Sequence, residues 1–185
     1  MKKLKVLLTG LVLTGLLLQH EDTWASSPKD VVDRFVQLDV NGARLTAQGW
    51  KQADVLFTKH AGPFQPTFIV VIASRYAVSQ DASRKDYFLL GYDDVGHIDT
   101  PTLKFTPTRV SAVRWWYEGY TVRLATGAQN GNDSAGWKIE GYQPTEMHLT
   151  AAAARRWVMQ VRDKTPDIAV HKNADQTLAE LKLYQ

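Results

Sequence analysis

A continuous apolar run at positions 68–73, Phe-Ile-Val-Val-Ile-Ala, is the sequence feature that most restricts what this chain can fold into. Successive side chains of a strand point to opposite faces of its sheet, so a strand that is apolar at every position has to be covered on both faces. The run continues as Arg-Tyr-Ala-Val at positions 75–78. We therefore expect one long strand here, buried on both sides at least in its first half.

Helical patterns lie on the N-terminal side of this strand. Ser27 and Pro28 are typical of an N-cap and a first helical position, and apolar residues then recur at helical spacing at positions 32, 35, 36, 40 and 43. Asp39 falls on the same apolar stripe, which points its carboxylate inward. Thr46 is predicted to cap a second short helix that runs to about position 56.

Strand patterns fill the middle of the chain. We expect strands at 86–92, 113–126 and 137–142, with a polar turn at 79–85 and a hairpin turn at 127–136 that is rich in Gly, Asn, Asp and Ser. Thr150 is predicted to cap a helix at 151–162, and Asn173 and Gln176 resemble a capping box for a final short helix. Helices followed by three or four meandering strands and a late helix predict an α+β domain with a mostly antiparallel sheet.

The first 25 residues have the pattern of a secretory signal peptide. A basic start at 1–5 precedes a 13-residue apolar run at 6–18, which is shorter than the roughly 20 residues that cross a bilayer. Thr23 and Ala25 place small residues at the two positions that a signal peptidase reads. We predict cleavage after Ala25 and a periplasmic or secreted protein with no stable membrane span. An uncleaved membrane anchor is the alternative.

The composition of the chain without its predicted signal peptide excludes several classes of partner and chemistry. Removing residues 1–25 discards three lysines and two acidic residues, which leaves 19 basic and 17 acidic residues in 26–185. Because the excess is small and no run of Lys and Arg is long enough to follow a phosphate backbone, a nucleic-acid partner is not expected. The chain has no cysteine, which excludes disulfides, thiolate nucleophiles and thiolate metal sites. Residues 26–185 are long enough for a single domain with its own core.

Six short segments resemble one known superfamily. They read VDRFVQLD at 32–39, GARLT at 42–46, GW at 49–50, FLLGY at 88–92, YTVRL at 120–124 and GWKI at 136–139. In this order they resemble secreted bacterial members of the nuclear transport factor 2-like superfamily, which includes SnoaL-like and ketosteroid isomerase-like domains. The resemblance covers about residues 28–165, and residues 166–185 are expected to form a helical extension. It implies a strongly curved sheet wrapped around the N-terminal helices, a cone that opens at one end to a cavity.

The resemblance leaves the activity open, because this superfamily hosts isomerases, dehydratases and cyclases as well as transport modules. An inward Asp39 could act as a general base, with Tyr76 or Tyr92 donating a hydrogen bond to a carbonyl oxygen of a substrate. The alternative is that Asp39 forms a structural ion pair with Arg44 or Arg75, and that the tyrosines are wall residues.

Aromatic residues are the candidates for a ligand-binding wall. Trp115 and Trp116 begin the densest aromatic cluster, and Trp50, Tyr87 and Tyr120 are further ligand-binding candidates. The same rings could instead pack the strands against the helices, because aromatic residues readily fill protein cores.

No metal or cofactor site is expected. The segment 93–99 gathers three aspartates and His97, but its spacing matches no ligand motif, and its acidic start is typical of a strand end. The segment 130–134 lacks the glycine and the distal glutamate that a calcium loop needs at loop spacing. His60, His148 and His171 are scattered, and the chain has no Gly-x-Ser-x-Gly elbow, phosphate-binding glycine loop or His-Glu-x-x-His helix.

These patterns together predict an exported, non-enzymatic or weakly specific domain that binds a small apolar or amphipathic ligand, or a partner through its open sheet face. Two alternatives stay open. One is an isomerase, dehydratase or cyclase with Asp39 as its base, and the other is a structural module that forms a homodimer through its sheet.

Overall fold

The computed structural model describes residues 27–58, 69–108, 115–125, 136–142 and 147–184. The expected signal peptide, residues 1–25, lies outside these ranges, and no helix within them is long and apolar enough to cross a membrane. In chain order the elements are α1 (Pro28–Val40), the 3-10 turn η1 (Ala43–Leu45), α2 (Ala47–Asp54), β1 (Ile69–Gln80), β2 (Tyr87–Asp99), β3 (Lys104–Pro107), β4 (Trp115–Ala125), β5 (Gly136–Tyr142), β6 (Met147–Thr150), α3 (Ala151–Arg162), α4 (Ile168–Glu180) and the 3-10 turn η2 (Leu181–Tyr184).

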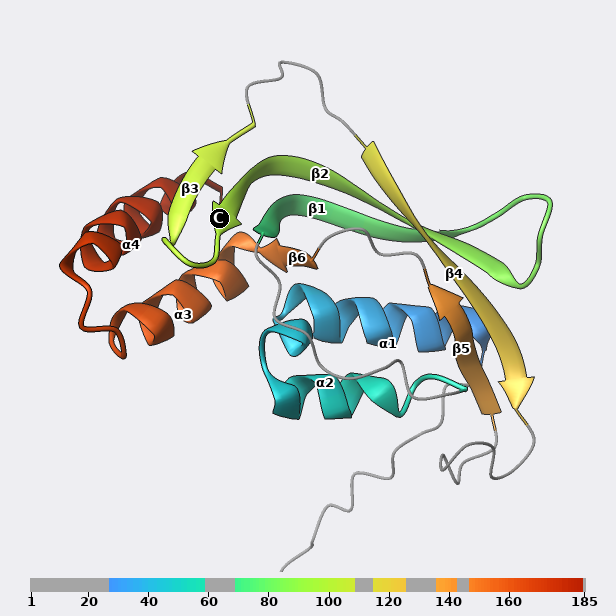
Figure 1. The fold of residues 1–185 in the computed structure, drawn as a ribbon. Coiled ribbons are helices and arrows are strands. Elements are labelled where there is room, and N and C mark those ends of the chain that lie inside the picture. Colours follow the sequence, from blue (N-terminus) through green and yellow to red (C-terminus); the bar gives the residue numbers. More distant parts are fainter. Residues whose placement is uncertain (1–26, 59–68, 109–114, 126–135, 143–146, 185) are drawn as a thin grey trace, which may run out of the picture.

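The strands form a strongly curled, mixed sheet that arches over α1 and α2 as a half-barrel, with α3 and α4 beyond one end (Figure 1). Its order is β5-β4-β2-β1-β6, and β3 pairs with the last residues of β2, beyond those that pair with β4. Among the named strands of the described part, β1 and β6 pair in parallel and the other pairs are antiparallel. The expected α+β class and the strong curvature are confirmed.

Three helices begin where local sequence signals predict. The side chains of the N-cap residues Ser27, Thr46 and Thr150 each accept a hydrogen bond from the backbone N–H three residues later. Pro28 stands at the start of α1, where its missing N–H removes no helical hydrogen bond. These caps satisfy donors that the first turn of a helix otherwise leaves unpaired.

The last helix begins earlier than predicted. Asp167 is the N-cap of α4, and its carboxylate accepts hydrogen bonds from the first turn of the helix. Asn173 and Gln176 lie inside α4 rather than in a capping box, and Asn173 donates to the backbone oxygen of Thr102. The prediction was wrong because Ile168, at the first helical position, is exposed, so the apolar stripe of α4 becomes visible only later in the sequence.

The sheet also contains more strand than predicted. β2 continues through Asp93 and Asp94 to Asp99, where the sequence suggested a strand end near Tyr92. β3 and β6 were not predicted, because each has only four residues and depends on pairing with a strand that is distant in the chain. β4 and β5 pair as the expected hairpin, while the turn residues 126–135 lie outside the described ranges.

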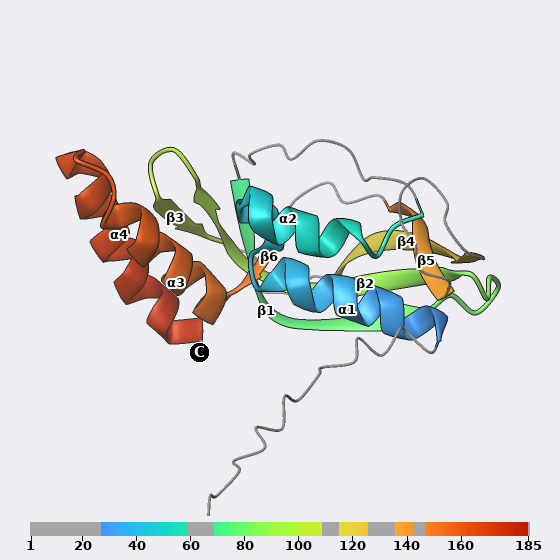
Figure 2. The same cartoon turned by 90° about the horizontal axis from the view of Figure 1, so that it is seen from below.

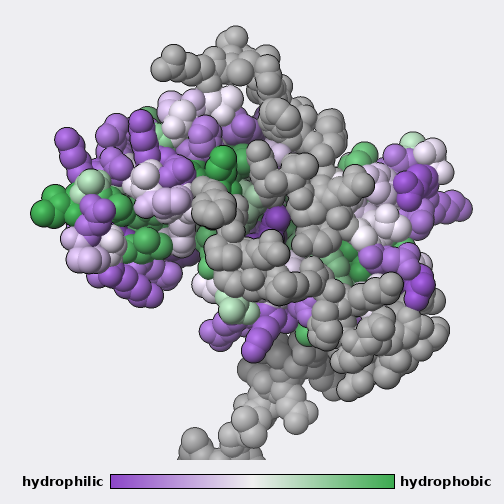
Figure 3. All heavy atoms as spheres, in the orientation of Figure 1, coloured by the Kyte–Doolittle hydropathy of each residue, from purple (hydrophilic) through white to green (hydrophobic). Residues whose placement is uncertain are grey.

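Two hydrophobic cores lie on opposite faces of the sheet. The first fills the concave face between the strands and α1–α2. The second packs α3 and α4 against β3, β6 and the adjoining ends of β1 and β2, and Figure 2 shows these two helices beyond that end of the sheet. β1 serves both: Val71 and Ala73 belong to the first core and Val70 and Ile72 to the second. The four residues are at most 4% exposed, so the prediction of a strand covered on both faces is confirmed. The surface over α3 and α4 in Figure 3 is mixed: hydrophilic residues alternate with hydrophobic ones, and Met159 of α3 and Ile168 of α4 are exposed.

The sheet bends where β2 passes Gly96. This glycine has φ 154°, and β1 beside it has two register shifts between Ile72 and Tyr76. A Cβ atom at position 96 would collide with the ring of Phe105 and with the backbone oxygen of Thr106. Glycine is therefore required both by the backbone angle and by the close approach of β3.

Replacing Gly96 with alanine is expected to lower the free energy of unfolding by about 2–3 kcal/mol, because the side chain adds backbone strain and overpacks against β3. Urea unfolding measures this loss. Gly141→Ala is the matched control, since no atom lies within 4 Å of the added Cβ there, and its effect should stay within about 0.5 kcal/mol. Equal effects of the two substitutions would contradict a constrained bend at Gly96.

Candidate functional site

Four polar side chains meet on the concave face of the sheet, and we call Asp39, Arg44, Tyr92 and His148 the inner polar cluster. Asp39 is on α1, Arg44 on η1, Tyr92 on β2 and His148 on β6. Tyr92 is in the first core, and the parallel register of β6 places His148 opposite Val71 of the same core. The cluster therefore joins two predicted site residues, Asp39 and Tyr92, with two residues that were not predicted as site residues.

The carboxylate of Asp39 is fully engaged by Arg44. Both of its oxygens accept hydrogen bonds of 2.6 Å, one from Nε and one from Nη2 of Arg44, and Asp39 is 2% exposed. Such bidentate pairs are the strongest geometry between arginine and a carboxylate. The ion pair with Arg44 that the sequence left as an alternative is present. The role of Asp39 as a general base stays a prediction, and its charge is already compensated.

His148 stacks against Tyr92 inside the cluster. The two ring centroids lie 3.8 Å apart at an interplanar angle of 49°, and the residues are 1% and 3% exposed. Burial lowers the pKa of His148 to about 3, and the positive charge of Arg44 adds to this shift. The imidazole is consequently neutral at pH 7. Sequence spacing gave no signal for this residue, because its neighbours are brought to it by the unpredicted strand β6.

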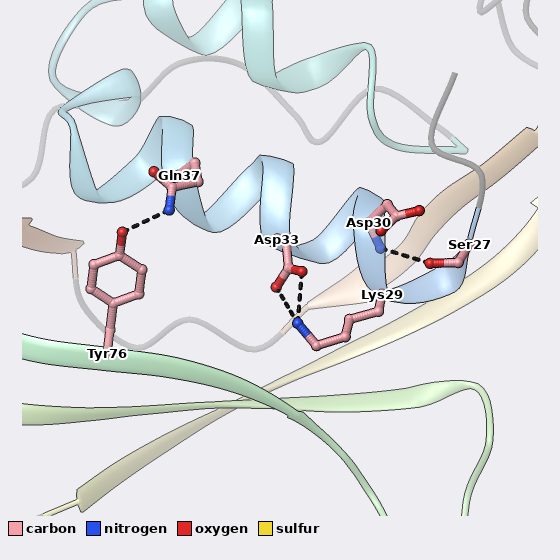
Figure 4. Close-up of polar contacts among 6 residues, drawn as sticks. All are labelled: Ser27, Lys29, Asp30, Asp33, Gln37 and Tyr76. Carbon is pink, nitrogen blue, oxygen red and sulfur yellow. Dashed lines mark hydrogen bonds and ion pairs between the residues drawn. The ribbon is translucent and has the colours of Figure 1, made fainter. Parts of the chain in front are cut away.

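Tyr76 lies on the same face but bonds to α1. It is the cross-strand partner of Tyr92, and its hydroxyl accepts a hydrogen bond of 2.8 Å from Nε2 of Gln37 (Figure 4). Tyr76 is half-buried and Gln37 is exposed, so this contact lies near the solvent. The two predicted tyrosines are therefore neighbours, yet each hydroxyl is in a different environment.

Trp50 and Tyr120 fill the concave interior as core residues. They are 8% and 0% exposed, and both pack into a ring cluster with Phe35 and Phe57. The centroid of Phe35 lies 5.1 Å from that of Phe57 and 5.8 Å from that of Tyr120, in edge-to-face arrangements. Among the described residues, these rings occupy the space that the cone prediction assigned to a ligand.

The other predicted wall residues do not join this cluster in the described part of the structure. Tyr87 is half-buried, its ring lies 4.2 Å from the guanidinium of Arg84, and its hydroxyl covers Gly119. Trp115 and Trp116 are on β4, where they are register partners of Asp93 and Tyr92, but their side chains lie outside the described part.

The acidic segment of β2 is used for structural contacts. Asp93 accepts a hydrogen bond of 2.6 Å from Arg75, and Asp94 accepts from the backbone N–H of Gly96 and from Thr108. Within the described ranges, no group of three or more His, Asp or Glu side chains could hold a metal ion. The segment 130–134, considered as a calcium loop, lies outside those ranges.

A buried lysine that the sequence analysis did not single out closes the end of α2. Lys138 on β5 is 3% exposed, and its Nζ donates a hydrogen bond of 2.6 Å to the backbone oxygen of Val55, the C-cap residue of α2. Burial, followed by repulsion from Arg34, lowers the pKa of Lys138. A cation at this position is favoured by the negative end of the helix dipole, so we assign Lys138 a structural role.

A cavity of about 170 Å³ lies outside the concave face, between α3 and the corner that joins α1 to α2. We call it the α3 pocket. Its lining residues are Asn41, Gly42, Leu45, Thr46, Ala153, Arg156, Trp157 and Gln160.

The α3 pocket combines an apolar wall with a polar rim. Ala153 is buried and Trp157 is half-buried, whereas Asn41 and Arg156 are exposed. Nη2 of Arg156 donates a hydrogen bond of 3.3 Å to Oδ1 of Asn41, which joins α3 to the end of α1. The pocket adjoins the inner polar cluster through η1, because Arg44 points inward to Asp39 while Leu45, the next residue, lines the pocket.

Comparison with known proteins adds no assignment: no protein-family model, curated protein or solved structure matches this chain.

Proposed function

We propose that this protein is an exported, non-catalytic domain that binds a small, partly apolar molecule in the α3 pocket. The observation that carries the proposal is a cavity of about 170 Å³ that brings the ring of Trp157 together with guanidinium, amide and hydroxyl groups. Small-molecule sites combine apolar surface with convergent polar groups that orient the ligand, and the α3 pocket has polar and apolar lining residues in about equal share.

The volume of the pocket limits the size of the ligand. Drug-sized ligands occupy pockets of roughly 300–1,000 Å³, whereas an engineered protein cavity of about 150 Å³ holds one benzene molecule. The α3 pocket, at about 170 Å³, is close to the second case. The proposed ligand therefore has a body of about one six-membered ring, with polar substituents that reach the rim.

A general-base enzyme is supported less well than a binding domain. A base has to reach the proton that it removes, at hydrogen-bond distance or through one water molecule. Asp39 has both oxygens bound by Arg44, and Asp39, Tyr92 and His148 are all at most 3% exposed. The Asp39–Arg44 pair is better explained as a structural contact between α1 and η1, and the Tyr92–His148 contact as packing between β2 and β6.

The half-barrel over α1 and α2 supports the resemblance to the nuclear transport factor 2-like superfamily, which we retain as part of the proposal. In a cone of that kind the ligand would enter the concave interior. The described interior is packed by Phe35, Phe57, Trp50 and Tyr120, so we place the ligand in the α3 pocket instead.

A chemical-shift titration of the ¹⁵N-labelled protein tests the proposed function. The probes are ring-sized molecules, both acids and neutral compounds: benzoate, cyclohexanecarboxylate, benzamide and phenol. At least one probe is expected to shift the amide signals of residues 41–46 and 153–160 in a saturable manner, because these residues surround the pocket. The amide signals of Tyr92 and Tyr120 are expected to stay in place.

Two results would contradict the proposal. Saturable shifts at Tyr92, Tyr120 and His148 would place the ligand in the concave interior. The absence of saturable shifts with all four probes would argue against a ring-sized ligand in the α3 pocket.

A further inference from the structure

We infer that the α3 pocket takes a monocarboxylic acid, with the carboxylate on Arg156 and a ring-sized apolar body against Trp157. This inference rests on the proposed function and extends it, because it names the chemical class of the ligand.

The charge of the pocket selects an anion. Arg156 is exposed on α3, and the lining residues that the structure describes include no aspartate or glutamate to neutralise it. Thr46, on the same rim, is the N-cap of α2, so the positive end of that helix dipole adds to the field. A negatively charged group is therefore favoured at this rim over a neutral or positive one.

The guanidinium of Arg156 contacts Asn41 while most of its donors remain available. Nδ2 of Asn41 donates a hydrogen bond of 2.8 Å to the backbone oxygen of Gln37, and this contact orients the Asn41 amide. Oδ1 of Asn41 then accepts from Nη2 of Arg156. Guanidinium has five N–H donors. Asn41 is the one hydrogen-bond partner that the described residues give Arg156, so a bidentate pair with a carboxylate remains possible.

The rest of the pocket suits an apolar body rather than a second charged group. Trp157, Leu45 and Ala153 provide the apolar surface, and Arg156 is the one charged residue among the described lining residues. A single guanidinium matches the single charge and planar shape of a carboxylate, whereas an inorganic phosphate would leave the Trp157 wall uncovered. The volume of about 170 Å³ fits a ring the size of that in benzoate.

Affinity measurements with matched probes and variants test the inference. The dissociation constant of benzoate is measured by NMR titration for the natural protein and for Arg156→Gln, Arg156→Lys and Arg84→Gln. The Arg156→Gln variant loses a charge-assisted bidentate contact, so its dissociation constant for benzoate is expected to rise about tenfold or more. Arg156→Lys, which keeps the charge but loses the planar fork, should weaken it less. Arg84→Gln, an exposed arginine beside Tyr87 and outside the pocket, should change nothing. Benzamide should bind more weakly than benzoate.

Failure of this inference can be told apart from failure of the proposed function. If benzoate and benzamide bound with equal affinity, and Arg156→Gln left that affinity unchanged, the inference that the ligand is a carboxylic acid would be wrong. The proposal that the α3 pocket binds a small molecule would still stand. If phosphate competed for the pocket as strongly as benzoate does, the inference that the ligand has a ring-sized apolar body would be wrong. Binding of none of the ring-sized probes would overturn the proposed function itself. The ¹⁵N spectrum of each variant shows whether it is folded.

Discussion

Replacing Arg44 with methionine is expected to lower the free energy of unfolding by about 3–5 kcal/mol, because the carboxylate of Asp39 would remain buried without its partner. Asp39 is 2% exposed in the folded protein. Urea unfolding followed by tryptophan fluorescence measures the change. This loss would exceed that of most single substitutions.

Two further variants separate charge burial from simple loss of packing. The double variant Asp39→Leu with Arg44→Met removes both charges and should return to within about 1 kcal/mol of the natural protein. Lys29→Met breaks the exposed pair with Asp33, whose side chains are 49% and 42% exposed, and should cost no more than about 0.5 kcal/mol. If Arg44→Met cost as little as Lys29→Met, the inner polar cluster would not be a buried network.

Acidification is expected to destabilise the protein through His148, whose folded pKa of about 3 lies below the ordinary value of 6.5. Between these two pH values, His148 is protonated in the unfolded chain but neutral in the folded protein. Its contribution to the free energy of unfolding is therefore complete above pH 6.5 and is lost as the pH falls toward 3. At about 1.4 kcal/mol per pH unit, the loss is about 2 kcal/mol at pH 5 and about 4 kcal/mol at pH 3, where the folded His148 is itself half protonated.

His148→Phe isolates this contribution, because phenylalanine keeps a ring against Tyr92 but cannot be protonated. Unfolding free energies at pH 7 and pH 5 are compared for the natural protein, His148→Phe and the control His97→Gln, whose side chain is only half-buried. The drop of about 2 kcal/mol should vanish in His148→Phe and persist in the control. An unchanged pH dependence in His148→Phe would contradict the burial of a neutral imidazole.

The features of the fold that depend on neighbouring residues could be predicted from the sequence. Ser27, Thr46 and Thr150 cap their helices with contacts three residues away, and the apolar run at β1 requires cover on both faces whatever lies there. β6 and the second half of β2 could not be predicted, because their stability comes from pairing with distant strands rather than from local alternation.

The residues of the candidate sites also differ in whether their partners are near or distant in the sequence. Asp39 could be placed inward by its helical position, and Arg44, five residues later, was a natural partner. His148 and Lys138 reach their neighbours only through the sheet. The α3 pocket is formed by segments that are far apart in the chain: the hydrogen bond between Asn41 and Arg156 spans 115 positions. No spacing rule connects such segments before the fold is known.

A crystal structure of the protein grown with benzoate tests the central claim most directly. The account predicts benzoate in the α3 pocket, with its carboxylate on the guanidinium of Arg156 and its ring against Trp157. Benzoate bound instead beside His148 in the concave interior, or an α3 pocket that stays empty at saturating benzoate, would contradict it.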